Sequence, residues 1–278
     1  MTEEEKIQAR KDGLTDEQIA EVEAKRKRDA QEAWNKIQYV ADKCAQRMRT
    51  AKRKFDDLTN EEVYQAHARL LMYIANNVCL ASQHRKYEVD EYNSKVLRFL
   101  LYYFNNCSLA ETVFPEKDYK LHKNLLLMGK AGTGKTLMMQ IFAEYLRATN
   151  NPNAFQDVSV TQMTNYFTMH NNIDLYTYNE ADTKAWEGRP HNVCLNDIGV
   201  ENRPFYGIDT RTIVCDFLHA RNEIWQQSVY SPDQSKFAHL TTNLTQKKLL
   251  EVFSDEFGRL TDRFKTYNII TLQGDSRR

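Results

Sequence analysis

Residues 129–136 read Gly-Lys-Ala-Gly-Thr-Gly-Lys-Thr and match the phosphate-binding loop pattern GxxxxGK[ST] at every position. The apolar residues 124–128 before the loop predict a strand, and apolar side chains spaced three and four apart after Lys135 predict a helix. In a strand, loop and helix arranged this way, glycines let backbone N–H groups approach an anion beside the positive end of the helix dipole. The sequence therefore predicts a nucleoside triphosphate site.

The two residues that close this motif have separate predicted roles. Lys135 is expected to reach the β and γ phosphates as a point charge, and the Thr136 hydroxyl is expected to ligate Mg²⁺. The predicted nucleotide-binding residues are Gly129, Lys130, Ala131, Gly132, Thr133, Gly134, Lys135, Thr136 and Leu137.

Composition limits the other classes of function. Apolar residues make up 41% of the 278 residues and charged residues 27%, which is typical of a soluble globular protein. No apolar run approaches the roughly 20 residues of a membrane span, and the acidic start does not resemble a secretory signal, so we expect a cytoplasmic protein. The 38 basic and 38 acidic side chains balance, so net charge predicts no nucleic-acid or membrane partner. The five cysteines lack metal-ligand spacing and are expected to be reduced thiols.

The first 110 residues are expected to form a helical domain. They contain one glycine, Gly13, and no proline. Residues 15–18 and 59–62 both fit the capping box, in which a hydroxyl and a carboxylate or amide satisfy the free amides of a helix start. The first box predicts a helix to about Phe55, the second a helix from about residue 60, and a third helix is expected over 91–106.

The long first helix has a basic character. Residues 25–54 hold eleven Lys or Arg against three acids, and a narrow apolar stripe runs along the same helix. The stripe consists of Trp34, Ile37, Val40, Ala41, Cys44 and Met48. This pattern suits a helix that docks on a partner protein or on nucleic acid, or a solvated helix that folds onto its neighbour.

Residues 111–278 are predicted to form an α/β domain with a parallel sheet flanked by helices, because strands and helices alternate after the phosphate-binding loop. The expected strands are 124–128, 156–160, 191–196, 236–242 and 267–272, and the expected helices after the loop helix are 161–169, 209–227, 246–253 and 257–264.

A triphosphate site also needs a carboxylate at the end of a neighbouring strand, to hold the Mg²⁺ shell and orient a water molecule. The stretch 193–201, Val-Cys-Leu-Asn-Asp-Ile-Gly-Val-Glu, offers Asp197. This stretch resembles the Walker B segment of DnaC-type helicase loaders and their IstB-like relatives, which are AAA+ ATPases with two adjacent acids at this place. Here the pair is Asn196-Asp197. Either Asn196 takes the metal-shell position and Asp197 the catalytic one, or Asp197 serves the metal and Glu201 or another acid orients the water.

The resemblance extends to three later segments. Residues 237–244 are similar to the sensor 1 strand, which implies that Asn243 lies beside the γ phosphate. Residues 257–264 resemble the segment that carries the arginine finger, a residue supplied by the neighbouring subunit. The match falls on Arg263, with Arg259 as the alternative. The terminal Ser-Arg-Arg resembles the family's closing Ser-x-Arg, which implies a sensor 2 role for Arg278.

The resemblance covers about residues 120–278 and implies an AAA+ ATPase that uses ATP and Mg²⁺. The GTPase motif NKxD is absent, which favours ATP. The implied function is a homo-oligomeric loader whose N-terminal helices hold a replicative helicase and place it on single-stranded DNA. Two alternatives stay open: an IstB-like transposition helper acting on duplex DNA, and a nucleotide-gated binding module with little turnover. The candidate DNA surfaces are the basic helix and the aromatic stretch 165–170.

Overall fold

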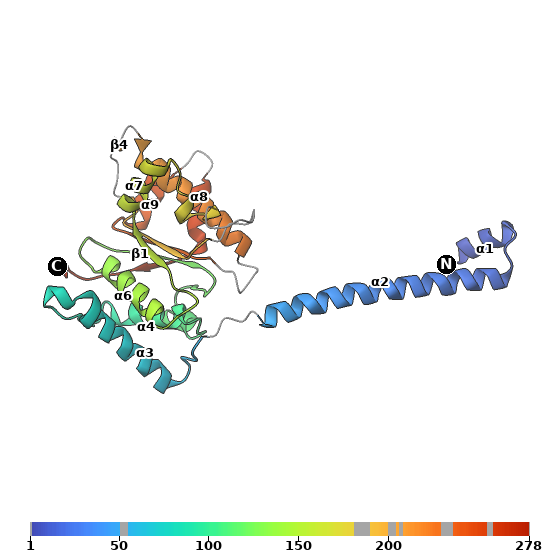
Figure 1. The fold of residues 1–278 in the computed structure, drawn as a ribbon, viewed down its shortest axis with the longest axis horizontal. Coiled ribbons are helices and arrows are strands. Elements are labelled where there is room, and N and C mark those ends of the chain that lie inside the picture. Colours follow the sequence, from blue (N-terminus) through green and yellow to red (C-terminus); the bar gives the residue numbers. More distant parts are fainter. Residues whose placement is uncertain are drawn as a thin grey trace. The chain divides into compact units, whose positions relative to one another are not determined.

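The computed structural model describes residues 2–50, 55–180, 190–199, 204–205, 208–228, 236–254 and 258–277; the side chains of 44–50, 204–205 and 208 are outside that description. The chain forms two compact units, Met1–Lys52 and Arg53–Arg278. Figure 1 shows helices alone in the first unit and a parallel sheet between helices in the second. The predicted α/β class with an N-terminal helical region is confirmed.

The first unit is a pair of helices, α1 (Glu3–Lys11) and α2 (Asp16–Thr50). Ion pairs from Lys6 to Glu23 (2.9 Å) and from Arg26 to Glu5 (3.1 Å) hold α1 along the first part of α2. The predicted capping box at the start of α2 is present: the Thr15 amide donates to the Gln18 side chain, and the Gln18 amide donates to the Thr15 hydroxyl.

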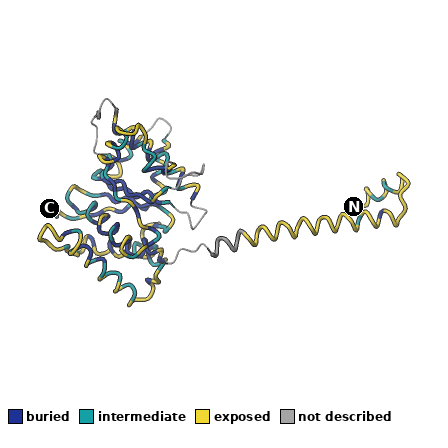
Figure 2. Tube along the Cα trace, viewed as in Figure 1, coloured by how far each residue is buried: buried dark blue, intermediate teal, exposed yellow. Residues whose placement is uncertain are grey.

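Farther along α2, described residues of the apolar stripe are exposed within this unit. Trp34, Ile37 and Val40 are 55%, 59% and 58% exposed within this unit, and Figure 2 shows the helix coloured as exposed along most of its length. Helix α1 therefore does not cover these three residues of the stripe.

The second unit is built on a five-stranded parallel sheet with the order β2-β3-β6-β1-β7. The strands are β1 (Asn124–Met128), β2 (Gln156–Ser159), β3 (Val193–Asn196), β6 (Ala238–Thr242) and β7 (Tyr267–Thr271). Because every neighbouring pair in this sheet is parallel, the carboxyl ends of all five strands lie along one edge. Two short segments, β4 (Pro204–Phe205) and β5 (Ile208–Asp209), form a separate antiparallel pair.

Helices cover both faces of the sheet and create two cores (Figures 1 and 2). Because side chains alternate along a strand, Leu125 and Leu127 of β1 enter one core and Leu126 and Met128 enter the other. All five residues of β1 are buried, which explains why the strand is apolar nearly throughout.

The first core lies under α3 (Glu61–Ile74), the π-helical turn η1 (Ala75–Cys79), α4 (Ser94–Phe104), α5 (Ala110–Val113) and α6 (Lys135–Ala148). The second core lies under α7 (Val160–His170), α8 (Thr210–Ser228), α9 (Gln246–Val252) and α10 (Arg259–Arg263). Short turns η2 (Ala81–Gln83), η3 (Asp174–Tyr176) and η5 (Phe264–Thr266) complete the unit.

The boundary between the compact units differs from the sequence-based division near residue 110. It falls after Lys52, because α3 and α4 bury their apolar faces against α6 and the sheet. Phe104 of α4, for example, is fully buried and lies 5.2 Å, ring centre to ring centre, from Phe142 of α6. Helical composition alone did not separate the two helices of the first unit from those that belong to the α/β core.

The start of α3 also differs from expectation. Asn60, not Thr59, is the N-cap: its side chain accepts a hydrogen bond from the Glu62 amide at 2.9 Å. The Thr59 hydroxyl instead donates to Asp57 at 2.7 Å. Because the Thr59 hydroxyl is hydrogen-bonded to the Asp57 carboxylate, it does not cap the helix, and the side-chain oxygen of Asn60 caps it instead.

Candidate nucleotide-binding site

The phosphate-binding loop lies at the carboxyl end of β1 and leads directly into α6. Its middle glycines, Gly132 and Gly134, have φ of +89° and +92°, a region that side chains with a Cβ rarely adopt. Gly134 is the residue immediately before α6, so the loop ends at the positive end of that helix. The local geometry that the motif requires is therefore present.

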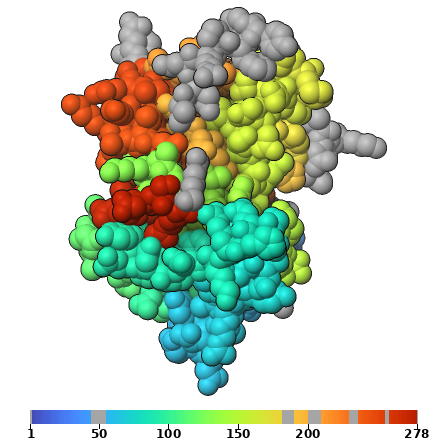
Figure 3. Space-filling model, turned by 90° about the vertical axis from the view of Figure 1, so that its left-hand side faces the viewer, coloured from blue at the N-terminus to red at the C-terminus, as the bar shows by residue number. Residues whose placement is uncertain are grey.

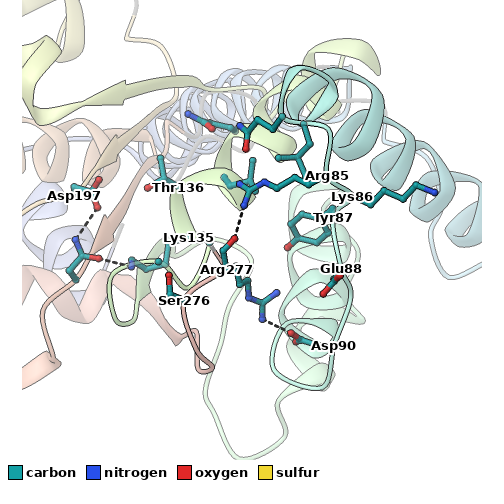
Figure 4. Close-up of a pocket in the computed structure, with 17 residues that line it drawn as sticks. Arg85, Lys86, Tyr87, Glu88, Asp90, Lys135, Thr136, Asp197, Ser276 and Arg277 are labelled. Carbon is teal, nitrogen blue, oxygen red and sulfur yellow. Dashed lines mark hydrogen bonds and ion pairs between the residues drawn. The ribbon is translucent and has the colours of Figure 1, made fainter.

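Lys135 is buried, and its ammonium group points back into the loop (Figure 4). Its Nζ donates to the carbonyl oxygens of Gly129 and Lys130 at 2.9 and 3.0 Å and to the Asn243 side-chain oxygen at 2.7 Å. The cation is held at the centre of the loop, which is where terminal phosphates would have to lie to meet the backbone amides.

Asp197 and Asn243 come from two other strand ends and lie at the same place. Asp197 directly follows β3, Asn243 directly follows β6, and the Asn243 amide donates to the Asp197 carboxylate at 3.4 Å. Asp197 has a φ of +61°, an uncommon conformation for a residue with a side chain. Its amide nitrogen donates to the Thr241 hydroxyl at 2.9 Å, which holds the chain in this turn. Lysine, carboxamide and carboxylate thus form a connected group at the sheet edge.

These three side chains line a cavity of about 690 Å³, within the range usual for small-ligand sites. Gly132, Gly134, Thr136 and Leu137 line it as well, whereas Gly129, Lys130, Ala131 and Thr133 do not. A hydroxyl at Thr136 and a carboxylate at Asp197 are hard oxygen ligands that suit Mg²⁺, which usually binds one or two such protein groups together with phosphates. Among the described residues there is no cluster of three or more His, Cys, Asp or Glu side chains that would hold a metal without a nucleotide.

Asn196 does not line this cavity; it is buried between the strands. Its amide nitrogen donates to the Asp157 carboxylate at 2.7 Å, and its oxygen accepts from the Thr241 hydroxyl at 3.1 Å. Of the two residues in the Asn-Asp pair, Asp197 is therefore the one that faces the ligand space.

The remaining predicted site residues lie elsewhere or outside the description. Glu201 and Arg278 fall outside the described residues. Arg263, at the end of α10, does not line the phosphate-loop cavity of its own chain, and its buried Nη1 has no partner within the described ranges. Burial lowers the pKa of this guanidinium. Arg259 begins the same helix and does not line the cavity either.

The opposite wall of the cavity was not anticipated from the sequence. It consists of residues 80–90, which include η2 and precede α4, and of the C-terminal tail, which Figure 3 shows in teal and red, side by side on one face of the unit. The residues from these two segments are Leu80, Gln83, Arg85, Lys86, Tyr87, Glu88, Asp90, Ser276 and Arg277. The adjacent Ser276 and Arg277 belong to the terminal motif noted in the sequence; the other segment gave no signal.

Arg277 joins the tail to the phosphate-binding loop and also to the segment that precedes α4. Its backbone amide donates to the Gly132 carbonyl at 2.9 Å, and its carbonyl accepts from Arg85 at 2.6 Å. Its guanidinium pairs with Asp90 at 2.7 Å (Figure 4). Ser276 lies so close to Gly132 that a Cβ at position 132 would collide with its side chain. The tail therefore crosses the phosphate-binding loop as a strap made of residues 274–277, the C-terminal strap.

The aromatic stretch proposed as a DNA surface is partly used for packing. Tyr166 and Phe167 of α7 pack against the second core, and the Tyr166 ring stacks on His170 with ring centres 4.2 Å apart. Met169 is 79% exposed.

No helix in the described part of the chain combines the length and apolar character needed to cross a membrane.

Comparison with known proteins adds a structural similarity. Neither the protein-family models nor the curated proteins give a significant match. A solved structure of a protein from Streptococcus pyogenes serotype M3, described as "a putative primosome component", is similar with 15% identity and a TM-score of 0.36. The similarity covers 68% of this chain and 84% of that one. It concerns the arrangement of the chain and assigns neither ligand nor activity to this protein.

Proposed function

We propose that this protein is a Mg²⁺-dependent ATPase of the AAA+ type. The observation that carries the proposal is the connected group of Lys135, Asn243 and Asp197 at the phosphate-binding loop, joined by contacts of 2.7 and 3.4 Å and lining one cavity. In this assignment Lys135 binds the β and γ phosphates, and Thr136 and Asp197 hold Mg²⁺. Asn243 positions the attacking water with a neutral amide, so no further charge enters the site.

Hydrolysis is proposed to need a second copy of the chain. The sequence resemblance assigns Arg263 as a finger acting on the neighbouring subunit, and its absence from the cavity of its own chain is compatible with that role. A guanidinium beside the γ phosphate would neutralise charge that develops there during transfer. Turnover per subunit should therefore rise with protein concentration.

The proposed client is a replicative helicase, held by the N-terminal helices and delivered to single-stranded DNA. The resemblance of residues 120–278 to DnaC-type loaders supports this part, together with the exposed apolar stripe of α2, which a partner could cover. Co-purification of the intact protein with the replicative helicase of its host tests the client. Equal retention by a variant in which Trp34 and Ile37 are replaced by Ser would contradict docking through the stripe.

A second candidate, a nucleotide-gated binding module with little turnover, is favoured by one observation. The residue before Asp197 is an amide that is hydrogen-bonded away from the cavity, so a second acid is missing from the strand end. One measurement separates the two: ATP retention and ATP hydrolysis by the full chain at increasing protein concentration, with and without Mg²⁺. Concentration-dependent hydrolysis supports the ATPase, whereas tight retention without release of phosphate supports the module.

A further inference from the structure

The carboxylate of Asp157 lies beside Asn196 although it belongs to a different strand. In the pairing of β2 with β3, Asp157 is opposite Cys194, and Asn196 is two residues farther along β3. Because alternate residues of a strand share a face, both side chains point to the α6 side of the sheet. The contact is the 2.7 Å hydrogen bond from the Asn196 amide nitrogen to the Asp157 carboxylate.

This contact fixes the direction of a chain of hydrogen bonds that ends at Asp197. A carboxylate can only accept, so the nitrogen of the Asn196 amide must face Asp157 and its oxygen must face Thr241. The Thr241 hydroxyl then donates its one proton to Asn196 at 3.1 Å. Its oxygen is left to accept the Asp197 amide at 2.9 Å. The acceptor at position 157 thus determines how the backbone of Asp197 is held in its left-handed turn.

A second connection runs from Asp157 to the cavity through α6. The Gln140 side chain lies near enough to Asp157 to favour its charged form, and Gln140 lines the cavity together with Asp197. Burial raises the pKa of the Asp157 carboxyl, and the Asn196 hydrogen bond and the nearby Gln140 side chain oppose that effect by stabilising the carboxylate.

The same geometry explains why position 196 carries an amide. An acid at 196 would place a second carboxylate against Asp157, at a site where Asn196 now makes a 2.7 Å contact. Two like charges at that separation repel, and one of them would take up a proton. The amide removes the repulsion and supplies the donor that Asp157 needs.

We propose that Asp157 is a positioning residue of this site: through Asn196 and Thr241 it sets the backbone of Asp197, and through Gln140 it contacts the wall of the cavity. This inference rests on the proposed ATPase function. It predicts that Asn196→Asp, which restores the acidic pair of the resembled family, lowers turnover instead of raising it.

The test compares four full-length proteins: wild type, Asp157→Asn, Asn196→Asp and the double exchange of both residues. Asn196→Asp should lower kcat for ATP about 10- to 100-fold, the usual effect of losing a group that orients a metal or catalytic ligand. Asp157→Asn should lower it only a few fold, because an amide at position 157 keeps an oxygen that can accept from Asn196. Nucleotide affinity should change little, because Lys135 and the loop are untouched. The double exchange should recover kcat to within a few fold, because Asp at 196 still accepts from Thr241 while Asn at 157 donates to it.

Controls separate positioning from folding and from the proposed function itself. Asp216→Asn, on α8 and away from the cavity, should keep wild-type kcat, and melting temperatures report whether each variant is folded. A gain of turnover in folded Asn196→Asp, or no recovery in the double exchange, would each overturn the inference while leaving the ATPase intact. If wild-type protein shows no turnover that depends on Lys135, the proposed function fails, and this inference fails with it.

Discussion

Lys135 offers the sharpest test of the nucleotide site. The residue is 4% exposed, and its ammonium group has three oxygen partners, two of which are backbone carbonyls of the loop itself. Replacing Lys135 by Ala removes the buried cation that would face the terminal phosphates. The vacated space opens to the cavity, so water can satisfy the three oxygens, and we expect the fold to persist with little change in melting temperature.

The magnitude follows from the burial of the charge. Two unit charges about 4 Å apart attract each other by about 4 kcal/mol at an effective dielectric constant of about 20. At roughly 1.4 kcal/mol for each factor of ten, the lost contact corresponds to a Kd for ATP that is ~1000-fold weaker. Salt should reduce this difference only slightly, because a charge inside the loop is poorly screened.

The assay is an equilibrium titration with a fluorescent ATP analogue, with Mg²⁺ present. Lys130→Ala is the matched control: it removes the same charge from the same loop, but from an exposed side chain that does not line the cavity. Its Kd should stay within a few fold of wild type, since exposed charges contribute little. An affinity loss below tenfold for Lys135→Ala, or equal losses for both variants, would refute the assignment of Lys135 to the phosphates.

Three further perturbations test the strap, the core and the finger. Gly132→Ala should displace the C-terminal strap, because a Cβ at position 132 would lie only 2.9 Å from the Cβ of Ser276. Limited proteolysis should then cleave the tail faster, and an unchanged cleavage rate would count against the contact. Burial lowers the pKa of His239 to about 3. Below pH 6.5 the unfolded state therefore binds a proton that the folded state does not, so the free energy of unfolding decreases as the pH is lowered. The free energy of unfolding, measured by urea unfolding, should be about 2 kcal/mol lower at pH 5 than at pH 7.5. This difference should disappear in His239→Gln; an equal difference in that variant would show that other groups cause it. Arg263→Ala should bind ATP but hydrolyse it slowly, and mixing it with Lys135→Ala protein should restore part of the activity if the finger acts in trans; no recovery in mixtures that co-assemble would exclude that arrangement.

The sequence was sufficient for features whose atoms are close together along the chain. The phosphate-binding loop, its glycines and Lys135 lie within one octapeptide, so the motif specifies their geometry directly. The five strands of the large sheet were predicted with small errors at their ends, because buried apolar runs between loops have few other solutions. Asp197 was expected at the end of a neighbouring strand, and the place of Asn243 was implied by the family resemblance; the parallel sheet brings the two strand ends to one edge.

Tertiary structure decided the features that depend on register and on segments distant in sequence. Asp157 contacts Asn196 because β2 and β3 pair in one register, and a shift by one residue would turn the carboxylate to the other face. Arg85 contacts Arg277 although the two residues are 192 positions apart in the sequence, and nothing in either local sequence indicates this contact. The sequence by itself therefore predicted a phosphate site and specified the loop at which it would begin. Only the packing of strands and tail decided which other side chains complete it, since those contacts arise when distant segments share a core.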